Sequence, residues 1–154
     1  MKPLRIYIDT SVFGGYFDNE FEKETKLLFE KIVKGEFRAV ISDLTQNELL
    51  SAPKKVRDLL KDLEVKNYEI ISVTNEEISL ATNYVNEKVV GQTSFEDCIH
   101  IATATANNVD LLVSWNFKHI VNIIRIRGYN SVNIKNGYHS IDIRSPKDLV
   151  YNED

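Results

Sequence analysis

The sequence has few of the residues that cross-link or interrupt a chain: one cysteine, three prolines and six glycines among 154 residues. A single cysteine, Cys98, excludes an internal disulfide framework and a cysteine-based zinc site, and we expect it to be a small buried residue on a helix. No run approaches the ~20 apolar residues of a membrane span. The amino terminus also lacks the apolar core of a signal peptide. We therefore expect a cytoplasmic protein that does not enter a membrane.

An excess of positive charge is also missing, since 19 Lys and Arg face 23 Asp and Glu for a net charge of −4. This balance does not indicate a nucleic-acid-binding protein by bulk charge, although a local basic patch can still bind phosphate. Basic residues at 54–61 and 118–127 are either such phosphate contacts or ordinary solvated helix surface. The length and the 43% hydrophobic content predict one domain, residues 1–154, with a substantial core.

Short apolar runs alternate with amphipathic segments along the whole chain. We expect strands at 4–9, 37–42, 68–73, 111–114 and 138–143. We expect helices at 21–34, 45–51, 54–63, 74–90, 94–106 and 117–127, with a loop or hairpin at 128–137. Apolar strands that alternate with helices are typical of a parallel sheet covered on both faces. The sequence therefore predicts an α/β protein: three α/β/α layers around a central parallel sheet of about four to five strands.

Three acids stand beside short apolar runs in separate parts of the chain: Asp9, Glu48 and Asp97. A fourth polar residue, Asn116, follows the apolar run at 111–115. Ligands of open parallel sheets bind beyond the carboxyl ends of the strands. Asp9 and Asn116 follow predicted strands, and the two other acids lie near the starts of predicted helices. The predicted topology therefore permits all four side chains to meet at one edge.

Each acid also has a purely structural interpretation. Glu48 follows Thr45 by three residues and Asp97 follows Ser94 by three, and both spacings fit a capping box at a helix start. Thr74 and Glu77 have the same spacing, and we assign Glu77 no function. Asp9 closes an apolar strand, so it should be partly buried, and a buried carboxylate is costly without a partner. A helix cap or a loop hydrogen bond would supply that partner without any catalytic role.

A convergent set of carboxylates suits a hard divalent cation such as Mg²⁺ or Mn²⁺. Such a cation could activate water and neutralise charge on a phosphodiester during in-line attack. Thr10 and Ser11 could then hold a phosphate oxygen or a water. His100 and His119 each follow a site residue by three positions, so they are either phosphate contacts or orienting groups, or else half-buried structural histidines.

Four motifs together resemble those of PIN domains. They are Asp9-Thr10-Ser11, the segment 41–48 that ends in Glu48, Asp97-x-x-x-Ile101-Ala102, and the segment Ser114-Trp115-Asn116-Phe117-Lys118-His119-Ile120. The resemblance covers nearly the whole chain in order and spacing. It implies a parallel α/β nuclease that uses Mg²⁺ or Mn²⁺ to cleave RNA. Small members, the VapC-like toxins, are commonly paired with an antitoxin protein and are often dimers.

The resemblance assigns Asp9, Glu48 and Asp97 as the metal-binding acids and, with Asn116, as the catalytic set. Contacts to the substrate would come from the neighbouring polar residues Thr10, Ser11, His100, Lys118 and His119. Many family members have Asp where this chain has Asn116, and an amide cannot contribute charge. We therefore expect an endoribonuclease toxin of a type II toxin–antitoxin pair. Two alternatives remain: a non-catalytic PIN-like module that binds RNA or protein, and a nuclease for RNA maturation or for DNA.

Overall fold

A computed structural model describes residues 2–151 and contains one five-stranded parallel sheet. Its strands are β1 (Leu4–Ile8), β2 (Phe37–Ser42), β3 (Tyr68–Ile71), β4 (Leu111–Val113) and β5 (Asp142–Arg144). The strand order is β3-β2-β1-β4-β5, so β1 lies in the centre. Leu4 pairs with Phe37 of β2, and Ile6 pairs with Leu111 of β4. The strand order reverses beside β1, which is where open parallel sheets bind their ligands.

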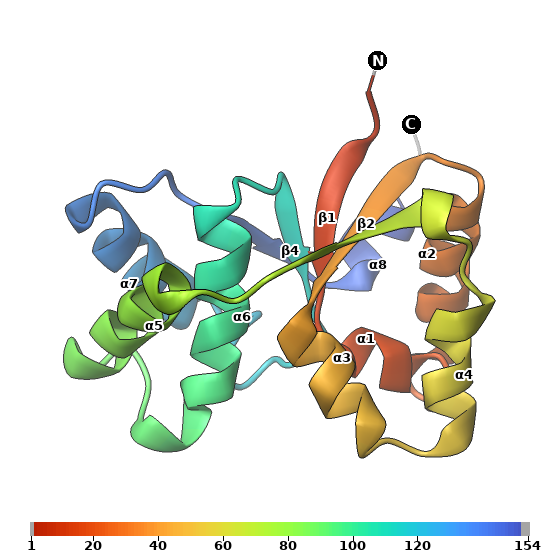
Figure 1. Cartoon of the computed structure of the whole chain (residues 1–154), viewed down its shortest axis with the longest axis horizontal. Helices are drawn as coiled ribbons and strands as arrows, with labels where there is room; N and C mark the ends of the chain where they lie inside the picture. The colour runs from red at the N-terminus through yellow and green to blue at the C-terminus, as the bar shows by residue number, and fades with distance from the viewer. Residues whose placement is uncertain (1, 152–154) are drawn as a thin grey trace.

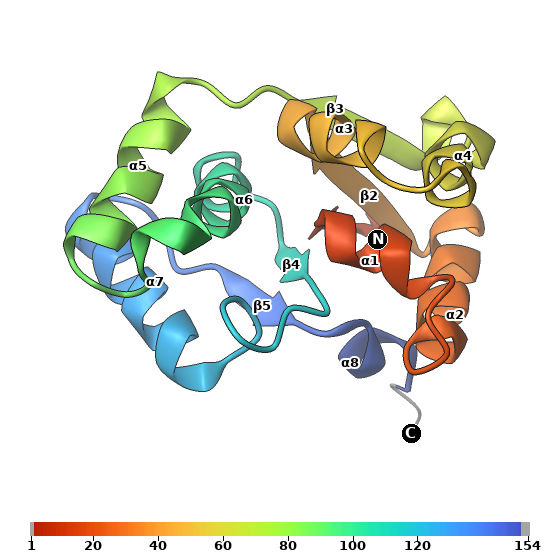
Figure 2. The same cartoon turned by 90° about the horizontal axis from the view of Figure 1, so that it is seen from below.

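Helices cover both faces of this sheet, as the sequence predicted (Figures 1 and 2). One face carries α1 (Thr10–Gly15), α2 (Glu22–Val33), α3 (Asp43–Leu50), α4 (Lys54–Asp62) and α8 (Pro146–Val150). The other face carries α5 (Asn75–Asn86), α6 (Phe95–Ala106) and α7 (Ile123–Lys135). Short 3₁₀ turns occur at Val65–Asn67 and Gln92–Ser94. The fold is therefore a three-layer α/β/α arrangement with parallel strands. None of the helices within residues 2–151 is both long and apolar enough to cross a bilayer.

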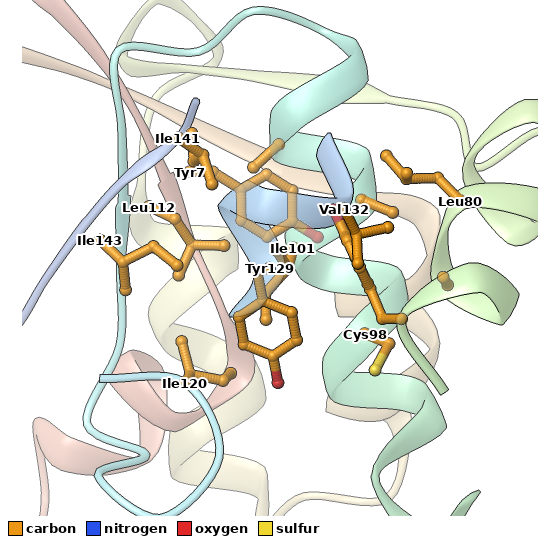
Figure 3. Packing of buried hydrophobic residues seen from close by; sticks show 14 of the residues in the cluster. Tyr7, Leu80, Cys98, Ile101, Leu112, Ile120, Tyr129, Val132, Ile141 and Ile143 are labelled. Carbon is orange, nitrogen blue, oxygen red and sulfur yellow. The ribbon is translucent and has the colours of Figure 1, made fainter. Parts of the chain in front are cut away.

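The two cores follow from the alternation of side chains along the strands. Ile6 and Ile8 of β1 belong to the core beneath α1, α2 and α4, whereas Tyr7 between them belongs to the core beneath α5, α6 and α7. Figure 3 shows Tyr7 among Ile101 and Leu112 of this second core. The central strands β1, β2 and β4 bury side chains on both faces of the sheet, which explains why they read as continuous apolar runs in the sequence.

The prediction was wrong between residues 117 and 137. A helix was expected at 117–127 and a loop or hairpin at 128–137, but the helix is α7, which begins at Ile123 and ends at Lys135. Asn122 caps it, because its side chain accepts hydrogen bonds from the backbone N–H groups of Ile124 (3.1 Å) and Arg125 (3.2 Å). Gly128 lies inside the helix, where a Cβ would come within 2.7 Å of Val89 Cγ1. Close packing therefore outweighs the low helix propensity of glycine at this position.

Smaller differences occur at other element ends. The six-residue helix α1 and the five-residue helix α8 were not predicted. The last strand was expected at 138–143 and is found at 142–144, and β3 ends at Ile71, two residues before the predicted end. Helix α5 ends at Asn86, about four residues before the expected end. Apart from α5 these elements have six residues or fewer, so local sequence patterns constrain them weakly, and the ends of any helix are the hardest part to place.

Candidate active site

Three of the four predicted site residues lie where strands end or a helix begins at the carboxyl edge of the sheet. Asp9 directly follows β1 and occupies the N-cap position of α1 with an extended backbone. Asn116 follows β4 by three residues, and Asp97 lies in the first turn of α6. Glu48 lies in the second turn of α3, the helix that directly follows β2. Figure 2 shows the starts of α1 and α3 together with the end of β4 from this edge. The parallel sheet therefore collects side chains from four distant segments.

Asp9 is buried, with only 4% of its surface exposed, and two serines hold its carboxylate. Ser11 Oγ donates to Asp9 Oδ1 (2.6 Å), and Ser114 Oγ donates to Asp9 Oδ2 (2.8 Å). Each serine also accepts a backbone N–H, from Trp115 to Ser11 (3.0 Å) and from Asn116 to Ser114 (2.9 Å). These bonds join the turn after β1 to the turn after β4, so the backbone sets the position of the carboxylate.

Burial is the main influence on the charge of Asp9. It raises the pKa of this carboxyl above its ordinary value, and repulsion from Asp97 adds to the effect. His100 and the two serine hydroxyls oppose the shift without cancelling it. The charged form of Asp9 is thus held at a cost in free energy, which a nearby cation would relieve.

Asp97 contacts Asn116, the residue at the fourth position of the predicted site. Asn116 Nδ2 donates to Asp97 Oδ2 (3.3 Å), while Asn116 Oδ1 accepts the backbone N–H of His119 (3.0 Å). The His119 bond fixes the orientation of the amide, because only the oxygen can accept it. Burial and the charge of Glu48 raise the pKa of Asp97 above its ordinary value. In this arrangement Asn116 holds Asp97, and its amide oxygen is already engaged.

Glu48 is held by two donors on a single oxygen. Thr10 Oγ1 and His100 Nε2 both lie 2.6 Å from Glu48 Oε1. Burial acts to raise the pKa of Glu48, but the hydrogen bond and charge of His100, together with Thr10, outweigh it and leave the pKa below the ordinary value. The exposed carboxyl of Glu96 interacts with Glu48, and this contact raises the pKa of Glu96. Glu48 therefore remains ionised more readily than the other acids of the site.

Three Ser/Thr-x-x-acid spacings were possible capping boxes, ending at Glu48, Glu77 and Asp97. Only the one that ends at Glu77 forms a capping box in the structure. Thr74 and Glu77 form the expected capping box at the start of α5. At α3 the N-cap is Ser42, whose partner is Thr45, so Glu48 takes no part in the cap. Ser94 precedes α6 and makes no capping bond through its side chain. Glu48 and Asp97 thus face the site instead of their own helix starts.

The predicted substrate-contacting residues divide into inner and outer groups. Thr10 and Ser11 direct their hydroxyls to Glu48 and Asp9, and His100 is only 2% exposed. Lys118 is exposed and His119 is half-buried, with a buried Nδ1 that has no hydrogen-bond partner among the described residues. Of these five residues, Lys118 alone is exposed. Sequence reasoning missed Ser114 and Tyr7 as site residues, because both lie within or beside apolar strands.

The chemistry of these donors fits a divalent cation. Within residues 2–151, no Lys or Arg forms an ion pair with Asp9, Glu48 or Asp97. The charge of Asp97 raises the pKa of Asp9, and the charge of Glu48 raises the pKa of Asp97, as expected where carboxylates await a cation. As their side chains stand, however, no three Asp, Glu, His or Cys groups of the described chain are arranged to hold a metal ion. Direct ligation by all three acids would therefore require side-chain rotation.

The PIN domain family model matches residues 6–118, which is most of the chain. The chain therefore belongs to the PIN domain family. PIN domains generally use divalent metal ions, and their VapC members are generally nucleases. A search of curated protein sequences gave no match.

Several solved structures are similar to this chain. A toxin–antitoxin complex from Klebsiella pneumoniae matches with a TM-score of 0.55 and 20% identity, covering 73% of this chain and 88% of that one. A DNA-bound VapBC from Salmonella typhimurium matches with a TM-score of 0.57 and 16% identity over 93% and 98% of the two chains. VapBC2 from Rickettsia felis, bound to a DNA fragment from their promoter, matches with a TM-score of 0.54 and 17% identity over 92% and 98%. At identities of 16–20%, these similarities show that the chains share a fold and no more than that.

Proposed function

We propose that this protein is a divalent-metal-dependent endoribonuclease and the toxin of a type II toxin–antitoxin pair. The observation that carries the proposal is the buried Asp9 carboxylate, which is held by hydroxyl groups, is repelled by Asp97 and forms no ion pair with a Lys or Arg of residues 2–151. Membership of the PIN domain family supports the nuclease assignment. The toxin assignment is supported by the likeness of the fold to chains from toxin–antitoxin complexes.

The cation, Mg²⁺ or Mn²⁺, would be held by Asp9 and Asp97, with Glu48 completing the set. When bound, a divalent cation supplies neutralisation of phosphodiester charge and lowers the pKa of water. Ser11 and Ser114 would keep the Asp9 carboxylate in place as the cation enters. Asn116 would hold Asp97, because its amide Nδ2 donates to that acid while the backbone N–H of His119 fixes its orientation.

The reaction would be hydrolysis of an RNA phosphodiester. A water oxygen attacks phosphorus, the bond from phosphorus to the 3′ oxygen breaks, and the 3′ oxygen takes up a proton. The products would be a 5′-phosphate and a 3′-hydroxyl. Lys118, which is exposed, and the half-buried His119 follow Asn116 along the chain and would contact the phosphate backbone, so RNA binding would weaken as salt rises.

The partners are also part of the proposal. An antitoxin protein would bind this chain, by analogy with the complexes of similar fold. A homodimer and a cytoplasmic location are further expectations from the resemblance to VapC-like toxins. Co-purification with the product of an adjacent gene for a small DNA-binding protein would test the antitoxin.

The direct test is cleavage of short RNAs by the purified chain in Mg²⁺, in Mn²⁺ and in EDTA. We expect cleavage with either metal, none in EDTA, and a loss of about 1,000-fold in Asp9→Ala, since the removed carboxylate is asked to supply several kcal/mol of stabilisation. Glu20→Ala, which removes an exposed acid from the segment between α1 and α2, is the matched control and should cleave normally. Equal cleavage by the wild type and Asp9→Ala would overturn the proposal.

One observation favours a second function, a PIN-like module that binds RNA or a partner without cutting. Asn116 replaces a charge at the fourth position, and the acids as they stand do not form a three-ligand cluster. Calorimetric titration with Mn²⁺ separates the two functions. Binding that is lost in Asp97→Asn supports the nuclease, whereas no measurable Mn²⁺ binding to the wild type supports the non-catalytic module.

A further inference from the structure

A buried chain of hydrogen bonds links Glu48 to the middle of the sheet. His100 Nε2 lies 2.6 Å from Glu48 Oε1, and His100 Nδ1 lies 2.6 Å from the hydroxyl of Tyr7. The Tyr7 hydroxyl is 2.8 Å from Ser42 Oγ. Tyr7 and Ser42 have no exposed surface, and His100 has 2%. These groups therefore cannot meet RNA, and their polar atoms serve the interior of the site.

The direction of the hydrogen bonds can be followed from one end. Ser42 Oγ accepts the backbone N–H of Thr45 (3.4 Å), which leaves the serine proton for Tyr7. His100 Nε2 donates to Glu48 whether the imidazole is neutral or charged, whereas Nδ1 accepts the Tyr7 proton in the neutral ring and donates to the Tyr7 hydroxyl in the charged ring. With the neutral ring, every donor in the chain has an acceptor. Ser42 caps α3 and Glu48 lies on α3. The hydrogen-bond chain therefore starts and ends at this helix, and it passes through Tyr7 on β1 and His100 on α6.

Glu48 needs such support more than Asp9 does. Asp9 is a short side chain between two serines, whereas Glu48 has a longer, partly exposed side chain. Holding a free glutamate in one conformation costs side-chain entropy. Thr10 also donates to Glu48 but contacts the same oxygen as His100, and the further hydrogen-bond partner Glu96 is exposed. Without His100, the carboxylate could turn about its terminal torsion toward solvent.

Resting on the proposed nuclease function, we propose that Tyr7 and His100 are positioning residues that hold the Glu48 carboxylate for the metal ion. His100 makes the contact, and Tyr7 fixes the ring of His100 from behind. Neither residue is a metal ligand or a substrate contact. Groups of this kind typically change metal affinity or activity by about 10- to 100-fold when removed.

The test compares three substitutions by Mn²⁺ titration, followed through the electron paramagnetic resonance of free Mn²⁺. His100→Leu removes both hydrogen bonds and should weaken Mn²⁺ binding by about 10- to 100-fold. His100→Gln keeps an amide donor for Glu48 and should recover part of that loss. Tyr7→Phe removes one hydroxyl and leaves the imidazole, so it should weaken Mn²⁺ binding less than His100→Leu. RNA cleavage should follow the same order.

Tyr84→Phe is the matched control for loss of a buried tyrosine hydroxyl. Tyr84 is also fully buried in the core beneath α5–α7, and its hydroxyl donates to Asn133, away from the acids. We expect it to lower thermal stability as Tyr7→Phe does while Mn²⁺ affinity stays at the wild-type value. If Tyr84→Phe weakens Mn²⁺ binding as much as Tyr7→Phe, or if folded Tyr7→Phe and His100→Gln both bind Mn²⁺ like the wild type, the positioning role is wrong.

A metal-free measurement separates this proposal from the proposed function. Long-range ¹H–¹⁵N spectra of the three histidines report which ring nitrogen carries the proton. In EDTA, His100 should carry a proton on Nε2, and its nitrogen shifts should change in Tyr7→Phe and in Glu48→Gln but not in Tyr84→Phe. Unchanged shifts in the first two variants would refute the hydrogen-bond chain. If the variants change the shifts in this way but the wild type neither binds Mn²⁺ nor cleaves RNA, the nuclease function is wrong and the hydrogen-bond chain is still supported.

Discussion

Glu48 on α3 and Glu77 on α5 have the same local pattern, because each follows a threonine by three residues, but they make different contacts. Glu77 reaches back to the backbone N–H of Thr74 (3.0 Å) and also accepts from Asn107 Nδ2 (3.1 Å). Glu48 turns away from its helix start and accepts from Thr10 and His100. The difference arises because the N-cap of α3 is Ser42 and not Thr45, the residue that the spacing suggested. The cap therefore lies about one helical turn earlier than expected.

The surroundings of the two acids differ as much as their partners. Burial acts to raise the pKa of Glu77, and hydrogen bonds from Thr74 and Asn107 leave it below the ordinary value. The pKa of Glu48 is lowered as well, but Glu48 raises the pKa values of its neighbours Glu96 and Asp97. A satisfied carboxylate is therefore not diagnostic by itself. What distinguishes Glu48 is that two other acids, Glu96 and Asp97, lie close enough for its charge to raise their pKa values.

The largest contrast is expected between Glu48→Ala and Glu77→Ala. Glu48→Ala should lower kcat/KM for RNA cleavage by about 100-fold, equivalent to about 2.7 kcal/mol of transition-state stabilisation. Glu77→Ala should destabilise the fold by about 1–3 kcal/mol, because it removes the hydrogen bonds that Thr74 and Asn107 donate to the buried Glu77 carboxylate. Cleavage by its folded fraction should be unchanged. Steady-state kinetics and urea unfolding measure the two effects.

The outcome that would break this contrast is a Glu77→Ala variant with reduced kcat/KM at a temperature where it is fully folded. Both acids would then contribute to catalysis, and the shared pattern would carry more than capping. Thr74→Ala removes the other side chain of the same capping box and should lower stability by about 1 kcal/mol with normal cleavage.

A smaller effect is expected from Asn116→Asp, which adds a carboxylate beside Asp97. Without metal, the hydrogen bond from the amide to Asp97 is replaced by repulsion, so the free energy of unfolding in EDTA should fall by about 1–3 kcal/mol. With metal, the added charge should tighten Mn²⁺ binding by about tenfold. Calorimetry with and without EDTA checks both signs. Weaker Mn²⁺ binding in the variant would show that the hydrogen bond from the amide to Asp97 contributes more to the metal site than an added charge does.

The smallest expected effect is a pH dependence of stability that differs between Asp9 and Glu48. The folded pKa of Asp9 is raised, so the native state binds more protons than the unfolded state above about pH 4, and stability falls with rising pH until the folded pKa is passed. Asp9→Asn lacks this cost. In EDTA, the unfolding free energy of Asp9→Asn should therefore increase relative to that of the wild type as pH rises. The increase should be at most about 1.4 kcal/mol per pH unit.

Glu48 should show the opposite sign. Its folded pKa is lowered, so the stability it contributes is present above its unfolded pKa and is lost as pH falls through the folded value. Urea unfolding of wild type, Asp9→Asn and Glu48→Gln from pH 3 to 8 resolves the two signs. Parallel pH profiles for all three chains would contradict the assigned environments.

Much of the architecture could be predicted because strong local patterns carry it. The apolar runs at β1, β2 and β4 placed the central strands, and Asp9 could be expected at the end of β1. The region 117–137 could not be predicted, because Gly128 looks like a helix break until Val89 is packed against it. The role of Tyr7 was hidden for a similar reason, since a tyrosine in an apolar strand shows its hydroxyl partner only when α6 is in place.

The sequence by itself determined the order of strands and helices, the parallel sheet they imply, and the presence of acids at the strand ends. These follow from periodicity and short-range chemistry, which each segment carries alone. Only the tertiary structure decided which acids act as caps and which converge, that Asn116 holds Asp97, and that His100 and Tyr7 stand behind Glu48. The physical reason is distance along the chain. Residues separated by 38 to 105 positions meet through hydrogen bonds of 2.6–2.8 Å that no local pattern encodes.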